Sequence, residues 1–184
     1  MYYQGHMEVT LIAAQTIDGY IARTELDRSF DWTSPEDKAF YISKLKESDA
    51  VIMGSKTFGT FTRYPKGKHF VILTRKPAEF VNPSPEVITV DATDAKPQQV
   101  LAQLQNEGYQ HVLVAGGSSV YRQYLAAGVV DRLFLTVEPV IFGAGVKLCD
   151  EALNAGGADG MVHLDLQKVH QLSSQTIVLE YLKK

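Results

Sequence analysis

The most informative stretch of the sequence is Val112-Leu113-Val114-Ala115-Gly116-Gly117-Ser118-Ser119-Val120-Tyr121. It opens with an apolar run, which is typical of a strand buried in a sheet. Two glycines follow, and glycine lets a ligand approach the backbone closely. After them we expect a helix over about residues 118–127. The free N–H groups and partial positive charge at the start of a helix suit a phosphate group.

The same stretch has a simpler interpretation. Two glycines also suit a tight turn between a strand and a helix, with Ser118 or Ser119 as an ordinary helix cap. The stretch contains neither a Gly-x-Gly-x-x-Gly pattern nor the lysine of a Walker motif, so it does not predict a phosphate site by itself. Both interpretations predict a strand, a turn and a helix in that order.

Two other predicted strands also end in polar residues. The apolar run at 50–53 is followed by residues 54–57, Gly-Ser-Lys-Thr, and the run at 69–74 is followed by Arg75. In open α/β sheets ligands bind beyond the carboxyl ends of the strands. Arg and Lys at such a place can hold a phosphorylated cofactor, although each cation taken alone is also typical of a solvated surface.

The order of the predicted elements favours an α/β fold. We predict strands at 8–14, 50–53, 69–74, 87–90, 111–115 and 132–137, and helices that begin at Pro35, Gly54, Pro97 and Ser118, the second of them running to Phe61. Such alternation predicts a doubly wound, mostly parallel sheet with helices on both faces. Alternating residues from Val162 and from Ile177, with two serines between them, predict a C-terminal antiparallel hairpin. Residues 23–31 are predicted to form a surface loop.

Composition restricts the class of protein. The 184 residues are 45% hydrophobic and 21% charged, which is typical of one globular domain. The net charge of −3 argues against a general nucleic-acid-binding protein. No apolar run reaches the ~18 residues of a membrane span. We expect residues 1–6 to be a tag remnant and residues 7–184 to be the single domain.

The sequence predicts neither a disulfide nor a metal site. Cys149 is the single cysteine, so one chain can form no internal disulfide and no zinc site of several cysteines, which fits the cytoplasm. The five histidines do not lie at ligand spacing from one another or from a Cys or carboxylate motif.

Asp37 has two interpretations. Ser34 suits the N-cap of a helix and Pro35 its first position, and Asp37 would then complete a capping box. Alternatively, Asp37 is a partly buried acid, because Phe40 and Tyr41 lie three and four residues further on, on the same face of the helix. Apolar surroundings raise the pKa of a carboxyl and prepare it to orient or protonate a substrate. The sequence leaves both interpretations open.

The ordered set of motifs resembles the dihydrofolate reductase superfamily. It comprises Leu11-Ile12-Ala13-Ala14, Trp32 with Pro35 and Asp37, Val51-Ile52-Met53-Gly54 with Thr57, Phe70 to Thr74, Ala115-Gly116-Gly117 with Val120-Tyr121, and Leu135-Thr136. Other motifs are similar to the reductase domain of the bacterial riboflavin-biosynthesis deaminase–reductase, the RibD type. These are residues 16–22, 33–36, 128–131 and 138–143. The resemblance covers nearly all of residues 7–184.

The resemblance implies a dihydrofolate-reductase-like domain with NADPH as hydride donor. The implied cofactor-binding residues are Ala14, Ile21, Gly54, Ser55, Lys56, Thr57, Thr74, Arg75, Ala115, Gly116, Gly117, Ser118, Ser119, Val120 and Tyr121. Among them, Thr74 and Arg75 would lie near the adenosine 2′-phosphate. Asp37 would be the catalytic carboxylate with Thr136 as its support, and Trp32, Tyr41 and Phe61 would shape the substrate pocket.

The implied reaction is hydride transfer to a pterin-, pyrimidine- or ribosylamine-like heterocycle, as in the reductases of riboflavin biosynthesis. A weak dihydrofolate reductase is an alternative, although Lys68 replaces the arginine that binds the glutamate carboxylate of folate, and lysine lacks the bidentate fork. A non-catalytic nucleotide-binding scaffold is an alternative of another class. The edge of the C-terminal hairpin and the resemblance both predict a homodimer.

Overall fold

A computed structural model describes residues 6–149, 153 and 160–184. Apart from His6, the predicted tag remnant lies outside these residues. The strands are β1 (Glu8–Thr16), β2 (Tyr20–Ala22), β3 (Ala50–Gly54), β4 (His69–Leu73), β5 (Thr89–Thr93), β6 (His111–Val114), β7 (Arg132–Glu138), β8 (Val146–Lys147), β9 (Leu164–Gln171) and β10 (Ile177–Lys183). The α-helices are α1 (Pro35–Glu47), α2 (Ser55–Phe58), α3 (Pro97–Asn106) and α4 (Ser118–Ala126), with short 3₁₀ helices at Ser29–Asp31 and Pro77–Glu79. None of the helices in the described ranges has the length and apolar composition that a membrane span needs.

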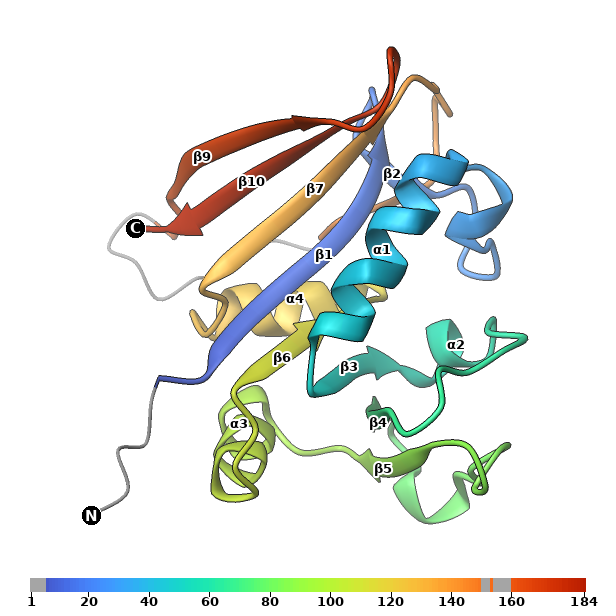
Figure 1. The fold of residues 1–184 in the computed structure, drawn as a ribbon, viewed down its shortest axis with the longest axis vertical. Helices are drawn as coiled ribbons and strands as arrows, with labels where there is room; N and C mark the ends of the chain where they lie inside the picture. The colour runs from blue at the N-terminus through green and yellow to red at the C-terminus, as the bar shows by residue number, and fades with distance from the viewer. Residues whose placement is uncertain (1–5, 150–152, 154–159) are drawn as a thin grey trace.

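Eight strands form one sheet in the order β5-β4-β3-β6-β1-β7-β10-β9 (Figure 1). The first six are parallel to one another, β10 is antiparallel to β7, and β9 is antiparallel to β10. The parallel α/β sheet and the C-terminal hairpin that the sequence predicts are therefore confirmed. A separate pair, β2 and β8, lies outside this sheet.

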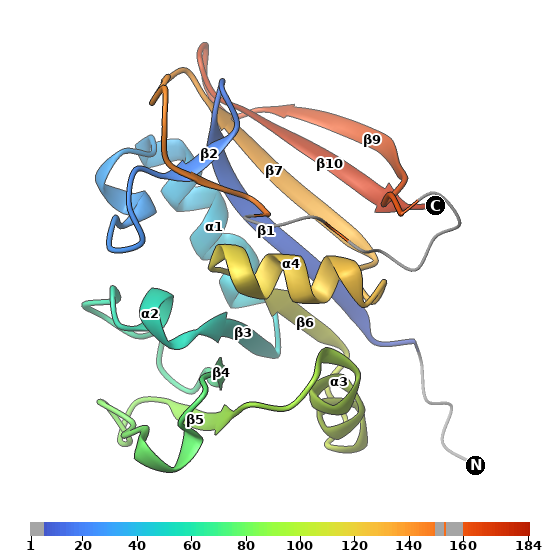
Figure 2. The ribbon, with the colours of Figure 1, turned by 180° about the vertical axis from the view of Figure 1, so that it is seen from behind.

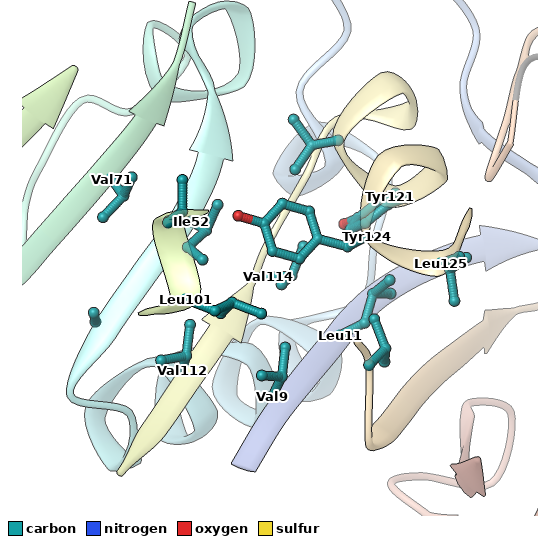
Figure 3. Close-up of a cluster of buried hydrophobic side chains, with 14 of the residues drawn as sticks. Val9, Leu11, Ile52, Val71, Leu101, Val112, Val114, Tyr121, Tyr124 and Leu125 are labelled. Carbon is teal, nitrogen blue, oxygen red and sulfur yellow. The ribbon is translucent and has the colours of Figure 1, made fainter. Parts of the chain in front are cut away.

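Helices cover both faces of the sheet. Alternate side chains of each strand point to opposite faces, so both faces present apolar side chains that the helices bury. α3 and α4 lie on the face that Figure 2 shows in front. There the strand residues Val9, Leu11, Ile52, Val71, Val112 and Val114 pack with Leu101 of α3 and with Tyr124 and Leu125 of α4 (Figure 3). Burying each such Leu or Val side chain stabilises the fold by about 1.5–3 kcal/mol.

The opposite face is covered by α1 and α2. Leu45 of α1 and Phe58 of α2 pack there on Ile12, Met53 and Phe70 of the sheet. α1 begins where the sequence predicts, since the Ser34 Oγ accepts a hydrogen bond from the Asp37 N–H at 3.1 Å and Pro35 occupies the first helical position. The carboxyl ends of the parallel strands thus emerge between α1 on one side and α4 on the other.

The structure corrects several predicted boundaries. β5 runs over Thr89–Thr93 instead of 87–90, because its pairing with β4 begins at Thr89. α2 ends at Phe58 instead of Phe61, and the N–H groups of Thr60 and Phe61 bond three residues back in a tighter turn. The hairpin begins at Leu164, two residues after Val162.

Four short elements were not predicted, namely β2, β8 and the two 3₁₀ helices at Ser29–Asp31 and Pro77–Glu79. β2 has three residues and β8 has two, too few to show alternation. β2 lies just before the predicted loop, and it pairs with β8 in the glycine-containing segment after β7. The 3₁₀ turn at Ser29–Asp31 lies inside the predicted loop, where an Arg28 to Asp31 ion pair spans it.

Candidate active site

A cleft of about 1170 Å³ opens at the carboxyl ends of β1, β3, β4 and β6. Its volume is at the upper limit of the ~300–1,000 Å³ that is usual for sites of small molecules and cofactors. The predicted site residues that line it are Ala14, Ile21, Asp37, Tyr41, Gly54, Ser55, Lys56, Thr57, Phe61, Thr74, Arg75, Ala115, Gly116, Gly117, Ser118, Ser119, Val120 and Tyr121. The topology brings these residues together because parallel strands end at one edge of the sheet.

Two predicted site residues, Trp32 and Thr136, do not line the cleft. The Trp32 ring packs edge to face on Phe142, with the ring centroids 5.1 Å apart. Thr136 is fully buried within β7, where its side chain acts on Asp37. The prediction that Trp32 shapes the wall of the substrate pocket is therefore not matched by its position.

The two glycines after β6 let the backbone pass close to Thr57 beside the start of α4. Gly116 has a φ of +124°, which a residue with a Cβ rarely adopts, and a Cβ on Gly117 would stand 3.0 Å from Thr57 Oγ1. The Gly116 carbonyl accepts a hydrogen bond from the Gly54 N–H at 2.8 Å, which joins the ends of β6 and β3. The Ser118 Oγ is buried and has no hydrogen-bond partner. A bare backbone, a helix N-terminus and a free hydroxyl together fit a phosphate group.

The cations of the cleft differ in how they are paired. Lys56 forms an ion pair with Glu25 of the loop before α1, and Arg28 forms one with Asp31. Arg75, Lys46 and Arg63 also line the cleft, and none of the three forms an ion pair with a residue in the described part of the chain. These three side chains are available to an anionic ligand.

Asp37 lies in the first turn of α1, faces the cleft and is 5% exposed. Burial is the main cause that raises the pKa of its carboxyl above the usual value. The hydroxyls of Thr136 and Thr33 lower that pKa, the charge of Glu138 raises it, and Lys38 lowers it. Asp37 is therefore a buried acid whose neutral form is favoured by its surroundings.

The hydrogen bonds of Ser34 decide between the two interpretations of Asp37. In a capping box the carboxyl of Asp37 would accept the Ser34 N–H. That N–H instead donates to Glu138 Oε1 at 2.8 Å. The cap is thus formed by Ser34, while the carboxyl of Asp37 takes no part in it. This arrangement supports the interpretation of Asp37 as a pocket acid.

Further buried polar groups lie around Asp37 but do not line the cleft. The hydroxyls of Thr33 and Thr136 act on the Asp37 carboxyl and lower its pKa. Trp32 Nε1 is buried and has no hydrogen-bond partner among the described residues.

The half-buried Tyr41 and the buried Tyr121 form the wall beside Asp37. The Tyr121 O–H donates to the Ile12 carbonyl at 2.7 Å, and the Tyr41 ring packs edge to face on Phe30. Burial raises the pKa of both phenols, and the charge of Asp37 raises it further. Both phenols are therefore neutral, and the wall is apolar with two polar tips.

Glu138 is the residue of this region that sequence reasoning missed. It ends β7 and is 2% exposed. Besides the Ser34 N–H, it accepts hydrogen bonds from Ser34 Oγ at 2.7 Å and from Thr176 Oγ1 at 3.0 Å. One signal could have found it: Glu138 lies two residues after Thr136, on the same face of the strand. No group of three His, Cys, Asp or Glu side chains in the described part of the chain could hold a metal ion.

The family model described as "RibD C-terminal domain" matches residues 7–178. An uncharacterized Bacillus subtilis protein, YwjB, is 25% identical over 155 residues, which are 80% of this chain and 85% of that protein. The dihydrofolate reductase HdrB of Haloferax volcanii is 29% identical over 126 residues, which are 65% of this chain and 61% of that enzyme.

Solved structures share the fold at lower identity. A putative riboflavin biosynthesis protein from Shewanella sp. PV-4 has a TM-score of 0.77 at 18% identity, with 97% of this chain and 99% of that chain covered. A deaminase/reductase from Thermotoga maritima has a TM-score of 0.76 at 21% identity, with 97% of this chain and 57% of that longer chain covered. Enterococcus faecalis dihydrofolate reductase complexed with NADP(H) has a TM-score of 0.68 at 18% identity, with 100% and 99% covered. These likenesses show the fold.

Proposed function

The chain belongs to the RibD C-terminal domain family, and we propose that it is an NADPH-dependent reductase of a pyrimidine-like heterocycle. The observation that carries the proposal is the position of Asp37. A buried acid faces one cleft that is also lined by two glycines, by the N-terminus of α4 and by Arg75, which has no ion pair among the described residues.

The cofactor end of the cleft lies between α2 and α4. Gly116, Gly117 and Ser118 would hold the pyrophosphate, because they line the cleft at the N-terminus of α4 and the Ser118 hydroxyl has no hydrogen-bond partner among the described residues. Arg75 would hold the adenosine 2′-phosphate, since it lines the cleft and has no ion pair within the described residues. Ala14 and Ile21 line the cleft next to Asp37, where the nicotinamide ring would lie.

NADPH, when bound, supplies the hydride. The protein holds the acceptor ring beside Asp37, whose neutral carboxyl can donate a proton or a hydrogen bond to a ring nitrogen or oxygen. Tyr41 and Tyr121 line that part of the cleft with neutral phenols and would limit the access of water to the ring. The proton thus comes from the α1 side of the ring.

The substrate end of the cleft favours a ligand that carries an anionic substituent. Lys46 of α1 and Arg63 of the segment after α2 line the cleft and have no ion pair among the described residues, and we assign them to the substrate. A phosphoribosyl group would supply the anion, as in the 5-amino-6-(5-phosphoribosylamino)uracil that the Thermotoga maritima relative is named for. We therefore place a phosphoribosylamino-pyrimidine first among the substrates to be tested.

Dihydrofolate is the second candidate substrate. The 29% identity with HdrB and the buried Asp37 favour it. Lys68 argues against it, because it lies outside the cleft lining and its Nζ donates to the Ser48 carbonyl. The protein would then bind the glutamate tail of a folate only through other cations.

The proposed enzyme is a homodimer that pairs through β9. This strand forms one edge of the sheet, and its Leu166 and Val169 are 52% and 50% exposed. An exposed apolar edge strand is suited to pairing with another chain. Sedimentation of the protein at two concentrations tests this part of the proposal, and a monomer at both would contradict it.

The cofactor assignment is tested by calorimetric titration of the protein with NADPH and with NADH. Arg75→Ala is expected to weaken NADPH binding by about tenfold to a hundredfold, which is the value of a charge-assisted hydrogen bond, and to leave NADH binding unchanged. Lys76→Ala is the matched control, since the adjacent Lys76 is paired with Glu79 and does not line the cleft. Equal losses for both cofactors would contradict the role of Arg75.

The reductase activity is tested by following NADPH consumption with a phosphoribosylamino-uracil and, separately, with dihydrofolate. Faster turnover of the pyrimidine supports the proposed function, and faster turnover of dihydrofolate favours the second candidate. Binding of NADPH without turnover of either substrate would favour a nucleotide-binding scaffold.

A further inference from the structure

Glu138 is a buried carboxylate that the proposed reaction does not use. It lies at the end of β7, and each hydrogen bond it forms is accepted from a donor: the N–H and the O–H of Ser34, and the O–H of Thr176. A carboxylate that accepts on both oxygens and meets only donors is suited to its ionised form. The protein therefore buries a negative charge near Asp37, which is costly unless the charge is hydrogen-bonded as it is here.

The contacts of Glu138 join three segments that are far apart in the sequence. Ser34 precedes α1, Glu138 ends β7, and Thr176 precedes β10. Ser34 is also the cap of α1, since its Oγ accepts the Asp37 N–H at 3.1 Å. Glu138 thus fixes Ser34 by hydrogen bonds, and Ser34 caps the first turn of α1. That turn carries Asp37.

From these contacts we propose that Glu138 is a positioning residue of the reductase: it holds the N-cap of α1 so that the carboxyl of Asp37 enters the cleft, and its buried charge acts on that carboxyl. The proposal rests on the proposed function only in taking Asp37 as the acid of the reaction. The bonds from Glu138 to Ser34 are 2.7 and 2.8 Å long, as expected for charge-assisted hydrogen bonds.

The charge of Glu138 has a second effect on the same acid. Around Asp37 lie the hydroxyls of Thr33 and Thr136, the phenols of Tyr41 and Tyr121, and the charges of Lys38 and Glu138. Lys38 favours the ionised carboxyl of Asp37, and Glu138 disfavours it by like-charge repulsion. Glu138 therefore both orients Asp37 and keeps it protonated to a higher pH.

Glu138→Gln is the decisive variant because it removes the charge and keeps the shape. The amide oxygen still accepts from Ser34, and the amide NH₂ can donate to the Thr176 oxygen. Thr176→Val is the matched control: it removes a donor to Glu138 and leaves both the charge and the bonds to Ser34. Glu138→Asp keeps the charge on a shorter side chain and serves as the conservative rescue.

The first readout is the titration of the Asp37 carboxyl, followed by carbon NMR on the ligand-free protein and assigned by comparison with Asp37→Asn. We expect Glu138→Gln to shift this titration to lower pH and Thr176→Val to leave it in place, while Glu138→Asp restores it in part. An unchanged titration in a folded Glu138→Gln protein overturns the proposal. Because this readout needs neither cofactor nor substrate, it is independent of whether the protein is a reductase.

The second readout is the pH dependence of turnover. In Glu138→Gln the fall of kcat on the alkaline side is expected to begin at lower pH, with a loss of up to about tenfold at neutral pH, since one unit of pKa changes the protonated fraction tenfold. The Kd for NADPH is expected to stay unchanged. A uniform loss at all pH values, matched by Thr176→Val, would mean that Glu138 is only structural.

Discussion

Both ends of the parallel strands carry polar side chains, but the two ends differ in their hydrogen bonds. The polar side chains Asp49, Lys68 and His69 at the amino ends form hydrogen bonds within the protein. At the amino ends, Asp49 Oδ2 accepts the N–H groups of Gln110 and His111, each at 2.8 Å. Lys68 Nζ, also at this end, donates to the Ser48 carbonyl. These bonds tie loops to strand starts and leave their polar atoms satisfied.

His69 is the buried member of the amino-end set. Its Nδ1 lies 2.8 Å from the Tyr109 hydroxyl and its Nε2 lies 2.9 Å from Asp91 Oδ2. Both ring nitrogens of a 6% exposed imidazole are therefore partnered within the protein. A residue of a type common in active sites is here a fixed connection between β4, β5 and the start of β6.

At the carboxyl ends, by contrast, the buried Ser118 hydroxyl has no hydrogen-bond partner among the described residues, and Asp37 has a buried carboxyl outside the helix cap. Unsatisfied buried polar groups are costly to an isolated fold. The difference fits the proposed function, in which the strand starts stabilise the fold and the strand ends bind a ligand. Substitutions at the two ends should therefore affect different measurements.

The largest expected effect is that of Asp37→Asn on turnover. Loss of the proposed proton donor should lower kcat by about 10²–10⁴-fold. Stability should not fall. A carboxyl whose pKa is raised by folding favours the folded state fully only below its unfolded pKa, and this contribution is lost as pH rises through the folded pKa. The variant should thus match the wild type in acid and exceed it in thermal stability at neutral pH.

The measurement for Asp37→Asn is thermal unfolding over a series of pH values together with steady-state kinetics. A variant that turns over normally would make the carboxyl dispensable. A variant that is less stable at neutral pH would show that this end of the strands also depends on Asp37 for folding, and it would break the comparison.

The next largest effect is expected at the opposite end, from His69→Ala. Removal of the buried ring and its two hydrogen bonds should lower the free energy of unfolding by about 2–3 kcal/mol. The Kd for NADPH should be unchanged, because His69 starts β4 and the cleft lies at the other end of that strand. Denaturant unfolding and calorimetric titration check the two parts.

A graded control sharpens the His69 result. Tyr109→Phe removes only the hydroxyl that meets Nδ1, and it should cost about 1 kcal/mol. If either variant raises the Kd for NADPH by more than twice the error of the titration, the amino ends and the carboxyl ends of the strands are energetically coupled.

The smallest effect is expected from Glu25→Gln. Glu25 pairs with Lys56 across the cleft lining, so its carboxylate competes with an anionic cofactor for the same ammonium group. The exposed pair is weak, and we expect NADPH binding to tighten by about twofold at low salt, less at high salt. Asp27→Asn is the matched control, because Asp27 of the same loop is paired with Arg23. Weaker NADPH binding in Glu25→Gln would show that Glu25 helps to form the site.

Much of the fold could be predicted from local pattern, because the buried parallel strands are continuous apolar runs. β3 and β4 each show this pattern, and each lies within one residue of its predicted bounds. β2 and β8 could not be predicted, because their pairing depends on the path of two loops rather than on alternation. α2 stops early because Gly59 is its C-cap and the turn after Phe58 tightens, and a glycine at this place is a local signal for a helix end.

The cleft was predictable for a different reason. Topology places the ends of parallel strands together, so residues such as Gly54, Arg75 and Gly117 had to meet once the strands were assigned. Trp32 could not be placed in this way, because the loop that carries it packs on Phe142. Glu138 escaped notice because a glutamate before a proline is typical of an exposed strand end, and only the tertiary structure brings Ser34 and Thr176 to it.

β1 is the first strand of the chain, yet it lies in the middle of the sheet between β6 and β7, which begin at His111 and Arg132. During protein synthesis the apolar residues of β1 therefore remain unpaired until β6 and β7 have been made. At the usual rate of elongation this takes on the order of ten seconds. Pairing over such a sequence separation also makes folding slow. A nascent chain that stops short of Arg132 lacks β7, the neighbour that completes the centre of the sheet. Such a chain also lacks Thr136 and Glu138, the two residues of β7 that act on Asp37.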